Sequence, residues 1–352
     1  MAGEVTGRSA PGPLAVVVRG GRVESVHLGH LVVLRPDGSV LLQVGDPDAA
    51  IWPRSSVKPL QAVATLEAGL DVDDEGLALA CASHSGTDAH LAVVRRVLAG
   101  AGLTEADLQN TADLPLDAGA AFAWRLGGRG PEPITQNCSG KHAAMLATCV
   151  AQGWDAATYR DPGHPLQRRV RATVERLTGV GVRDVTVDGC GAPLLSTTVR
   201  GLARALGLVA AAAAEPGRAD AVARVGRAMA ARPDLVGGPG RDVTRFMQAW
   251  PGLVAKDGAE GVYAAGLPDG TGVAFKVADG SARPRAAVLA AALEAALEAA
   301  APGGALEPAA EAALRGIREI GRTPVLGHGV PVGEVHAPLG RADADVDVGG
   351  QW

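Results

Sequence analysis

The chain has 352 residues and a formal net charge of −5, and 47% of its residues are hydrophobic and 20% charged, which is typical of a globular protein. Charged residues are scattered and no Lys/Arg-rich run occurs, so nucleic acid is not an expected partner. The N-terminus lacks the pattern of an export signal, and no uncharged apolar stretch is long enough to cross a bilayer. These features predict a cytoplasmic protein without a membrane partner.

Strands are predicted at the start of the chain. Residues 14–18 and 23–28 have the pattern of short strands, and residues 31–35 and 40–44 form a predicted hairpin around a Pro-Asp-Gly turn. Helical patterns then dominate, with one short strand at 185–187 that enters a Gly-rich turn. The predicted helices cover 57–68, 89–99, 104–110, 141–152, 165–178, 196–206 and 217–231.

Strands return near the end, at 253–255, 262–265 and 272–277, and helices at 285–301 and 307–317 follow. The last ten residues are acidic and Gly-rich and are expected to fray. Because strands joined by tight turns pair antiparallel, we predict an α+β fold. Its antiparallel sheet is built from both termini, about 14–45 and 252–278, and is flanked by helices. A helical lobe, about 57–250, is inserted between the two parts, and with no linker or repeat 1–352 is expected to be one domain.

Lysine is rare in this chain, which makes each lysine informative. The 33 basic residues comprise 29 arginines and four lysines. Arginine replaces lysine wherever a solvated charge suffices, but a guanidinium cannot lose its proton to act as a base or a metal ligand. Lysines that remain in a chain that otherwise prefers arginine are expected to take part in catalysis or metal binding more often than usual. The plainer interpretation is that they have no special role. They are Lys58, Lys141, Lys256 and Lys276.

Ser55 and Lys58 are three residues apart at a predicted helix start. On a helix this spacing places both side chains on one face. A serine hydroxyl needs an adjacent base to become a nucleophile, and a desolvated lysine near other cations can lose its proton near neutral pH. Because proline lacks a backbone N–H, Pro59 fits only in the first turn of a helix, so the helix is expected to start here. The alternative is that Ser55 or Ser56 caps the helix.

Two further segments extend this pattern. Ser83 and Ser85 flank His84 after an apolar run, and Lys256 ends an apolar strand before Asp257 and Gly258. Ser-x-x-Lys, Ser-x-Ser and Lys-x-Gly reproduce the order of the three active-site elements of serine β-lactamases. The alternatives are a helix cap at the serines and an exposed strand-end charge at Lys256. Lys276 on the next strand is the more ordinary lysine, although it can also face the site.

The four cysteines are too few for a disulfide scaffold. Cys138 lies three residues before Lys141, and Cys190 lies between two glycines. Two thiolates suit zinc, and a neutral lysine amine can add a third ligand. The alternatives are two buried reduced cysteines, or a nucleophilic Cys138 with His142 as its base.

These motifs together resemble the Rhizobium etli type of L-asparaginase, in the asparaginase II family. The resemblance lies in five segments, in the family's order: Arg54-Ser55-Ser56-Val57-Lys58-Pro59-Leu60-Gln61, Cys81-Ala82-Ser83-His84-Ser85-Gly86, Asn137-Cys138-Ser139-Gly140-Lys141-His142, Asp188-Gly189-Cys190-Gly191-Ala192-Pro193 and Lys256-Asp257-Gly258-Ala259-Glu260-Gly261. It implies a fold related to serine β-lactamases and glutaminases, and a homodimer.

The resemblance also implies roles for particular residues. Two Ser–Lys pairs fall on Ser55–Lys58 and on Ser83–Lys256, with Ser85 and Lys276 as less favoured partners in the second pair. A zinc ion that tunes substrate binding falls on the ligand set Cys138, Lys141 and Cys190.

The expected activity is hydrolysis of L-asparagine through a Ser55 acyl-enzyme, with Arg54, His142 and Asp188 as candidate substrate-binding residues. The alternatives are a glutaminase, a hydrolase of β-lactams or peptides, and a non-catalytic sensor of zinc or amino acids. One methylene separates asparagine from glutamine, so the sequence does not choose between them.

Overall fold

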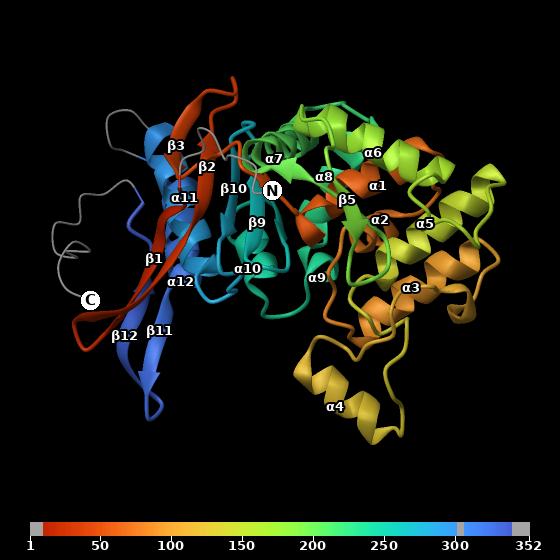
Figure 1. Cartoon of the computed structure of the whole chain (residues 1–352), viewed down its shortest axis with the longest axis horizontal. Helices are drawn as coiled ribbons and strands as arrows, with labels where there is room; N and C mark the ends of the chain where they lie inside the picture. The colour runs from red at the N-terminus through yellow and green to blue at the C-terminus, as the bar shows by residue number, and fades with distance from the viewer. Residues whose placement is uncertain (1–9, 301–305, 340–352) are drawn as a thin grey trace, which may run out of the picture.

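The computed structural model describes residues 10–300 and 306–339. Figure 1 shows two parts: a sheet with α11 and α12 at its side, and a lobe of helices that contains α1 to α6. Within the described ranges, no helix combines the length and the apolar character that crossing a bilayer requires.

The main sheet is antiparallel and draws its strands from both ends of the chain. Among the described residues, eight strands run in the order β11-β12-β1-β2-β10-β9-β8, with β3 beside β2, and every pair is antiparallel. The strands are β1 (Gly12–Arg19), β2 (Arg22–Leu34), β3 (Val40–Val44), β8 (Val254–Asp257), β9 (Val262–Gly266), β10 (Gly272–Val277), β11 (Thr323–Gly327) and β12 (Val330–His336). The predicted α+β architecture, with a sheet built from both termini, is therefore confirmed.

The sheet differs from the prediction at two places. The two strands expected over 23–35 form one strand, β2, because Gly29 continues it. A Cβ at Gly29 would lie 2.1 Å from the carbonyl oxygen of Lys276, so this glycine permits close strand packing rather than a turn. The hairpin β11–β12 was not predicted, since its strands are mostly exposed and lack a clear alternation of apolar residues. The predicted fraying of the last ten residues concerns positions outside the described ranges.

Two short pairs of strands lie outside this sheet: β4 (Ala50–Ile51) with β7 (Thr197–Thr198), and β5 (Val185–Val187) with β6 (Pro193–Leu195). The β5–β6 turn contains the Gly-rich segment that holds Cys190. The strand predicted at 185–187 is thus confirmed.

The region between the two halves of the sheet is mainly helical, as predicted. Its helices are α1 (Lys58–Glu67), α2 (Asp74–Ala80), α3 (Asp88–Gly100), α4 (Ala118–Leu126), α5 (Ser139–Gln152), α6 (Pro165–Thr178), α7 (Val199–Ala214), α8 (Ala221–Ala231), α9 (Pro233–Val236) and α10 (Asp242–Ala249). The helix predicted over 104–110 is wrong: only a 3-10 turn, η2 (Glu105–Asp107), forms there. Thr104 and Asp107 cap each other across that single turn.

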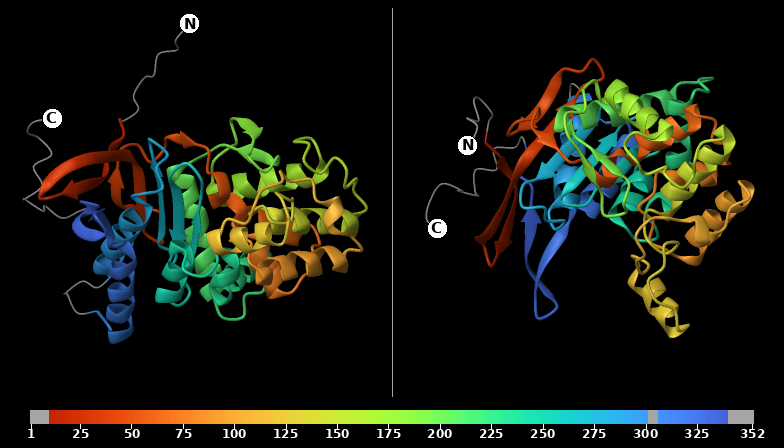
Figure 2. Two further views of the ribbon diagram at one scale, coloured as in Figure 1. Left: turned by 90° about the horizontal axis from the view of Figure 1, so that it is seen from below. Right: turned by 45° about the vertical axis from the view of Figure 1, so that its right-hand side comes forward.

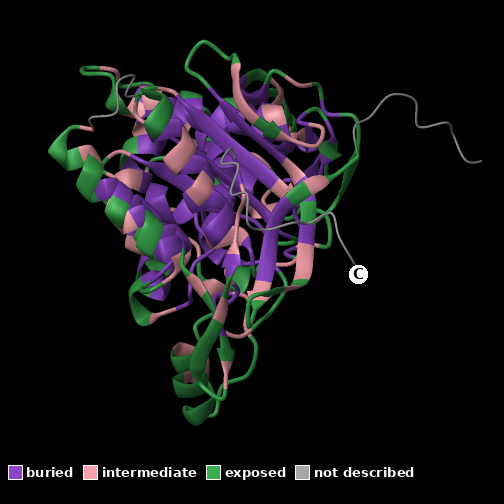
Figure 3. Cartoon of the chain, turned by 90° about the vertical axis from the view of Figure 1, so that its left-hand side faces the viewer, coloured by how far each residue is buried: buried purple, intermediate pink, exposed green. Residues whose placement is uncertain are grey.

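Helix α7 packs directly on the sheet because glycines face it. A Cβ at Gly272 would lie 2.1 Å from the carbonyl oxygen of Ala203, and one at Gly266 would lie 2.0 Å from that of Leu206. Helices α11 (Arg285–Ala300) and α12 (Pro308–Gly321) lie on the other side of the sheet (Figure 2). Figure 3 shows that the strands between these layers are buried over most of their length.

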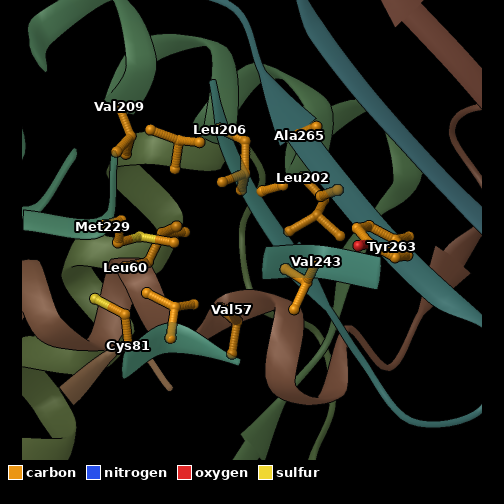
Figure 4. Packing of buried hydrophobic residues seen from close by; sticks show 14 of the residues in the cluster. Val57, Leu60, Cys81, Leu202, Leu206, Val209, Met229, Val243, Tyr263 and Ala265 are labelled. Carbon is orange, nitrogen blue, oxygen red and sulfur yellow. The ribbon is translucent and has the colours of Figure 1, made fainter. Parts of the chain in front are cut away.

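One hydrophobic cluster extends from the sheet into the helical lobe. It contains Tyr263 and Ala265 of β9, Leu202 of α7 and Leu60 of α1, which lie together in Figure 4. This packing places the 3-10 turn directly before α1, η1 (Arg54–Val57), next to β8.

Candidate active site

Ser55 and Lys58 lie in the turn that leads into α1. Residues 54–57 form a 3-10 turn, η1 (Arg54–Val57), and α1 starts at Lys58 with Pro59 in its first turn. Arg54 has a φ of +50°, in the left-handed region that is strained for residues other than glycine. Ser55 is half-buried, whereas Ser56 is fully buried. Ser55 is therefore the hydroxyl of this turn that a molecule from solvent reaches.

The amine of Lys58 is buried and reaches the segment after α2. It donates hydrogen bonds to the carbonyl oxygen of Ala82 at 2.5 Å and to the hydroxyl of Ser83 at 3.1 Å. Ser85 faces elsewhere, since its hydroxyl donates to the carbonyl oxygen of Gly237 at 3.0 Å. The structure thus brings Ser83, rather than Ser85, to a lysine.

Lys256 lies on β8 and is completely buried. Its amine donates to the carboxylate of Asp257 at 2.5 Å and to the backbone carbonyl of the same residue at 2.8 Å. Burial lowers the pKa of Lys256 to about 8; the charges of Lys58 and Arg241 also lower it, and Asp257 opposes them. A lysine with this pKa exchanges its proton near neutral pH.

The predicted Ser–Lys pairing differs from these contacts. Among the hydrogen bonds of the described residues, Lys58 bonds Ser83 rather than Ser55, and Lys256 bonds Asp257 rather than Ser83. The physical reason for the second difference is that a carboxylate is a stronger acceptor than a hydroxyl. Lys276, the other candidate for the second pair, donates to the carbonyl oxygens of Glu260 and Val277 instead.

Asp257 and Arg241 were missed as candidates. One carboxylate oxygen of Asp257 accepts from Lys256, and the other accepts from Arg241 at 2.5 Å. Arg241 also donates to the backbone carbonyl of Ser83. Although burial opposes it, the charges of Lys256, Arg241 and Arg285 hold the pKa of Asp257 well below its usual range. Asp257 was detectable as the neighbour of Lys256, but Arg241 carries no signal among 29 arginines.

Arg54, the first residue of η1, forms an ion pair with Asp188. The Nε of Arg54 donates to Asp188 at 2.8 Å, and their side chains are 24% and 11% exposed. Asp188 also accepts from the N–H of Gly189, which fixes the start of the β5–β6 turn. Two of the three predicted substrate-binding residues therefore lie together, with Arg54 directly before Ser55.

Cys138, Lys141 and Cys190 converge in a buried cluster. Cys138 precedes α5 and Lys141 lies in its first turn, and the amine of Lys141 is 3.1 Å from the sulfur of Cys190. The neighbouring Cys138 thiol and the charge of Lys141 hold the pKa of Cys190 well below its usual range, although burial opposes this. The Cys138 thiol itself donates to the side-chain oxygen of Asn137 at 3.1 Å. Contact with Cys190 and burial raise the pKa of Cys138.

His142, the third predicted substrate-binding residue, lies in this cysteine cluster rather than beside Arg54. Its Nδ1 is 2.5 Å from the hydroxyl of Tyr159. Burial lowers the pKa of His142 to about 4, although contact with Cys190 opposes this. Its Nε2 is buried and has no hydrogen-bond partner in the described part of the chain.

The donor atoms of this cysteine cluster decide whether a metal ion fits it. Within residues 10–300 and 306–339, no group of three His, Cys, Asp or Glu side chains is arranged to hold one. The two thiols form a three-donor set only when the amine of Lys141 is included. Sulfur and nitrogen are the donors that zinc prefers, and the unpartnered Nε2 of His142 lies beside them. These residues fit a small zinc site that uses lysine.

The family profile described as L-asparaginase II matches residues 15–337. No curated protein matches the chain. Similar solved structures include Mglu, at 15% identity and a TM-score of 0.43, covering 79% of this chain and 69% of that one.

Two other solved structures are a β-lactamase candidate of Bacteroides dorei DSM 17855 and a β-lactamase of Mycobacterium bovis. Both are 15% identical to this chain, with TM-scores of 0.39 and 0.33. The first match covers 71% of this chain and 84% of that one, and the second covers 72% and 88%.

Proposed function

Because the chain belongs to the L-asparaginase II family, we propose that it hydrolyses L-asparagine to L-aspartate and ammonia through an ester on Ser55. Within the family we propose the Rhizobium etli type, which the hydrogen bond between the buried Lys58 and Ser83 supports. The alternative amides, L-glutamine and β-lactams, are outcomes of the test below.

The observation that carries this proposal is the hydrogen bond from the buried Lys58 to Ser83, next to the turn that holds Ser55. Lys58 donates to Ser83, and Lys256 lies on β8, which packs against η1, the turn that holds Ser55. Burial, helped by the charges of Lys58 and Arg241, lowers the pKa of Lys256, so a lysine of this site gives up its proton readily. A neutral lysine near serine hydroxyls is the base that a serine nucleophile requires.

The proposed reaction has two stages, formation of an ester on Ser55 and its hydrolysis. Neutral Lys58 takes the hydroxyl proton of Ser55, and the serine oxygen bonds to the amide carbon of the substrate. The carbon–nitrogen bond breaks, and the leaving nitrogen receives the proton from Lys58 through the hydroxyl of Ser83. Water then attacks the ester, which releases L-aspartate and restores the hydroxyl of Ser55.

The roles of the remaining residues follow from their positions. Arg54 pairs with the α-carboxylate of the substrate, and Asp188 lies beside Arg54, where it can bind the α-ammonium group. Arg241 positions Ser83 through its carbonyl and Lys256 through Asp257. Cys138 is not the nucleophile in this proposal, because its thiol is buried and donates to Asn137, while Nδ1 of the expected base, His142, contacts Tyr159.

Cys138, Lys141 and Cys190 would hold a zinc ion, with His142 beside them. When bound, zinc would supply a fixed positive charge close to the Asp188 turn, which would tune substrate binding. Verified removal of zinc is therefore expected to raise KM more than it lowers kcat. An unchanged KM in the metal-free protein would contradict this role.

The test is ammonia release from L-asparagine and L-glutamine, with hydrolysis of a chromogenic β-lactam in parallel. Wild type, Ser55→Ala and Cys138→Ser are compared. We expect release from L-asparagine that Ser55→Ala abolishes while the variant remains folded by circular dichroism. Near-wild-type activity of Ser55→Ala would exclude the proposed nucleophile, and loss only in Cys138→Ser would assign the thiol in its place.

A further inference from the structure

Two residues with strained backbones face each other at the entrance of the candidate site. Among the described residues, only three other than glycine have a clearly positive φ: Arg54 at +50°, Glu260 at +57° and His328 at +49°. The side chains of the first two approach each other, with 3.8 Å between Nη1 of Arg54 and Oε1 of Glu260. Strain of this kind clusters at functional sites.

Stability does not account for this pair. The Glu260 side chain is 64% exposed, and an exposed ion pair contributes little to folding. The left-handed conformation of Glu260 is the one that its two-residue hairpin turn requires, because Val262 donates to the carbonyl of Ala259 across Glu260 and Gly261. The left-handed conformation of Arg54 has no such turn behind it, and it costs more than an exposed ion pair returns. The arrangement therefore points to a role outside folding.

Glu260 is held in place from two sides. It lies in the β8–β9 turn, four residues after Lys256. Its carbonyl oxygen accepts from the amine of Lys276 at 2.6 Å, and that amine also donates to the carbonyl of Val277 at 2.7 Å. Gly280 leaves room for the carboxylate, because a Cβ there would lie 2.5 Å from Oε2 of Glu260. The scarce lysine that lies outside the catalytic cluster thus fixes this turn.

The charges around Ser55 complement a free α-amino acid. Arg54 lies between two carboxylates, Asp188 at 2.8 Å and Glu260 at 3.8 Å. The guanidinium matches an α-carboxylate, because its planar fork binds carboxylates with two parallel hydrogen bonds. The two acidic side chains then offer the partners that an α-ammonium group needs.

We propose that Glu260 binds the α-ammonium group of the substrate opposite Arg54, and that Lys276 positions Glu260 for this contact. This inference rests on the proposed function and deepens it: the site selects amides that carry both α-groups of a free L-amino acid. Glu260 is then a specificity-determining residue, and Lys276 is a positioning residue that does not touch the substrate.

The experiment compares two substrates that differ in one group. L-Asparagine carries the α-amine, whereas succinamic acid has the same amide and carboxylate without it. The ratio of their kcat/KM values is measured for wild type, Glu260→Gln, Lys276→Met and Lys276→Arg. Glu311→Gln is the matched control, because Glu311 is also exposed and pairs only at 4.0 Å with Arg315 on α12.

Glu260→Gln is expected to lower kcat/KM for L-asparagine about tenfold, since a charged hydrogen bond is lost. The kcat/KM for succinamic acid should change by no more than about twofold, because this substrate has no α-amine for Glu260 to contact. Lys276→Met should shift the ratio in the same direction, Lys276→Arg should restore part of it, and Glu311→Gln should behave as wild type. Equal losses on both substrates, or no loss on either, would overturn the assignment of Glu260. A Lys276→Met protein that is less stable but keeps the wild-type ratio would overturn the assignment of Lys276.

A wild type that releases ammonia from neither substrate would instead remove the proposed hydrolysis. Binding of L-aspartate and of succinate is then compared by calorimetry in wild type and Glu260→Gln. Selective weakening of L-aspartate would support the ammonium contact without the reaction. Equal weakening, or no binding of either ligand, would overturn it.

Discussion

Replacing Lys256 by methionine is expected to abolish activity without loss of stability near neutral pH. The side chain is completely buried, and its pKa is about 8 instead of the ordinary 10.5. At pH values below about 8, Lys256 is charged in the folded state, so folding must bury an ammonium group. The difference between the two pKa values corresponds to a loss of folding free energy of roughly 3 kcal/mol.

The neighbours of Lys256 decide whether this cost is recovered on substitution. Removing one partner of a buried ion pair usually destabilises a protein, because the other charge is left unpaired. Asp257 keeps a second partner here, since Arg241 donates to its other oxygen at 2.5 Å. Lys256→Met should therefore be at least as stable as wild type at pH 7, by up to about 3 kcal/mol.

The pH dependence gives a sharper test of the same argument. Between the folded and unfolded pKa values of Lys256, the unfolded chain binds more protons, so the stability of the wild type rises with pH. Relative to Lys256→Met, which lacks this group, the wild type should gain about 2 kcal/mol between about pH 7 and about pH 9.5.

Urea unfolding of both proteins at several pH values measures this difference. Leu289→Ala, a substitution in the core of α11, is a control whose destabilisation should not depend on pH in this range. The reasoning would be refuted if Lys256→Met were several kcal/mol less stable at every pH, or if its difference from wild type did not change with pH.

Three further outcomes are expected. Arg241→Met should lower kcat about tenfold, because Ser83 and Lys256 lose their common support; an unchanged kcat in a folded variant would argue against that support. Cys190→Ala should remove bound zinc from the purified protein, measured by inductively coupled plasma mass spectrometry against wild type, and equal zinc contents would exclude the cluster as its site. Gly272→Ala should destabilise the protein by about 2 kcal/mol or more, since the new Cβ would lie 2.1 Å from the Ala203 carbonyl; an unfolding midpoint equal to that of wild type would show that α7 moves away without cost.

The sheet was predictable where turn chemistry and apolar strands occur together. The Pro-Asp-Gly turn before β3 and the turn between β9 and β10 both connect strands at the expected places. The exposed hairpin β11–β12 was not, because it contributes few apolar side chains to the core. The alternation of apolar residues along a strand reflects burial of one face, so a strand that lies outside the core has no such alternation to predict it.

The candidate site was predictable in its members but not in its contacts. The scarcity of lysine singled out Lys58, Lys141 and Lys256, and these three are buried, with exposures of 1%, 3% and 0%. Which serine each lysine contacts depends on how α1, the segment after α2 and β8 pack together. Arg241 and Glu260 were missed for the same reason, since their roles arise from contacts between distant segments and from backbone conformation.

The burial of these lysines also bears on how the protein can be attached to other materials. Amine-directed reagents, which couple enzymes to supports or polymers, need an accessible lysine. Lys276 is the one lysine of the four that is not fully buried, and two backbone carbonyls already occupy its amine. Coupling through lysine would therefore be sparse and would fall on the turn that holds Glu260. Chemistry directed at the exposed carboxylates far from that turn is the better choice for immobilising this protein.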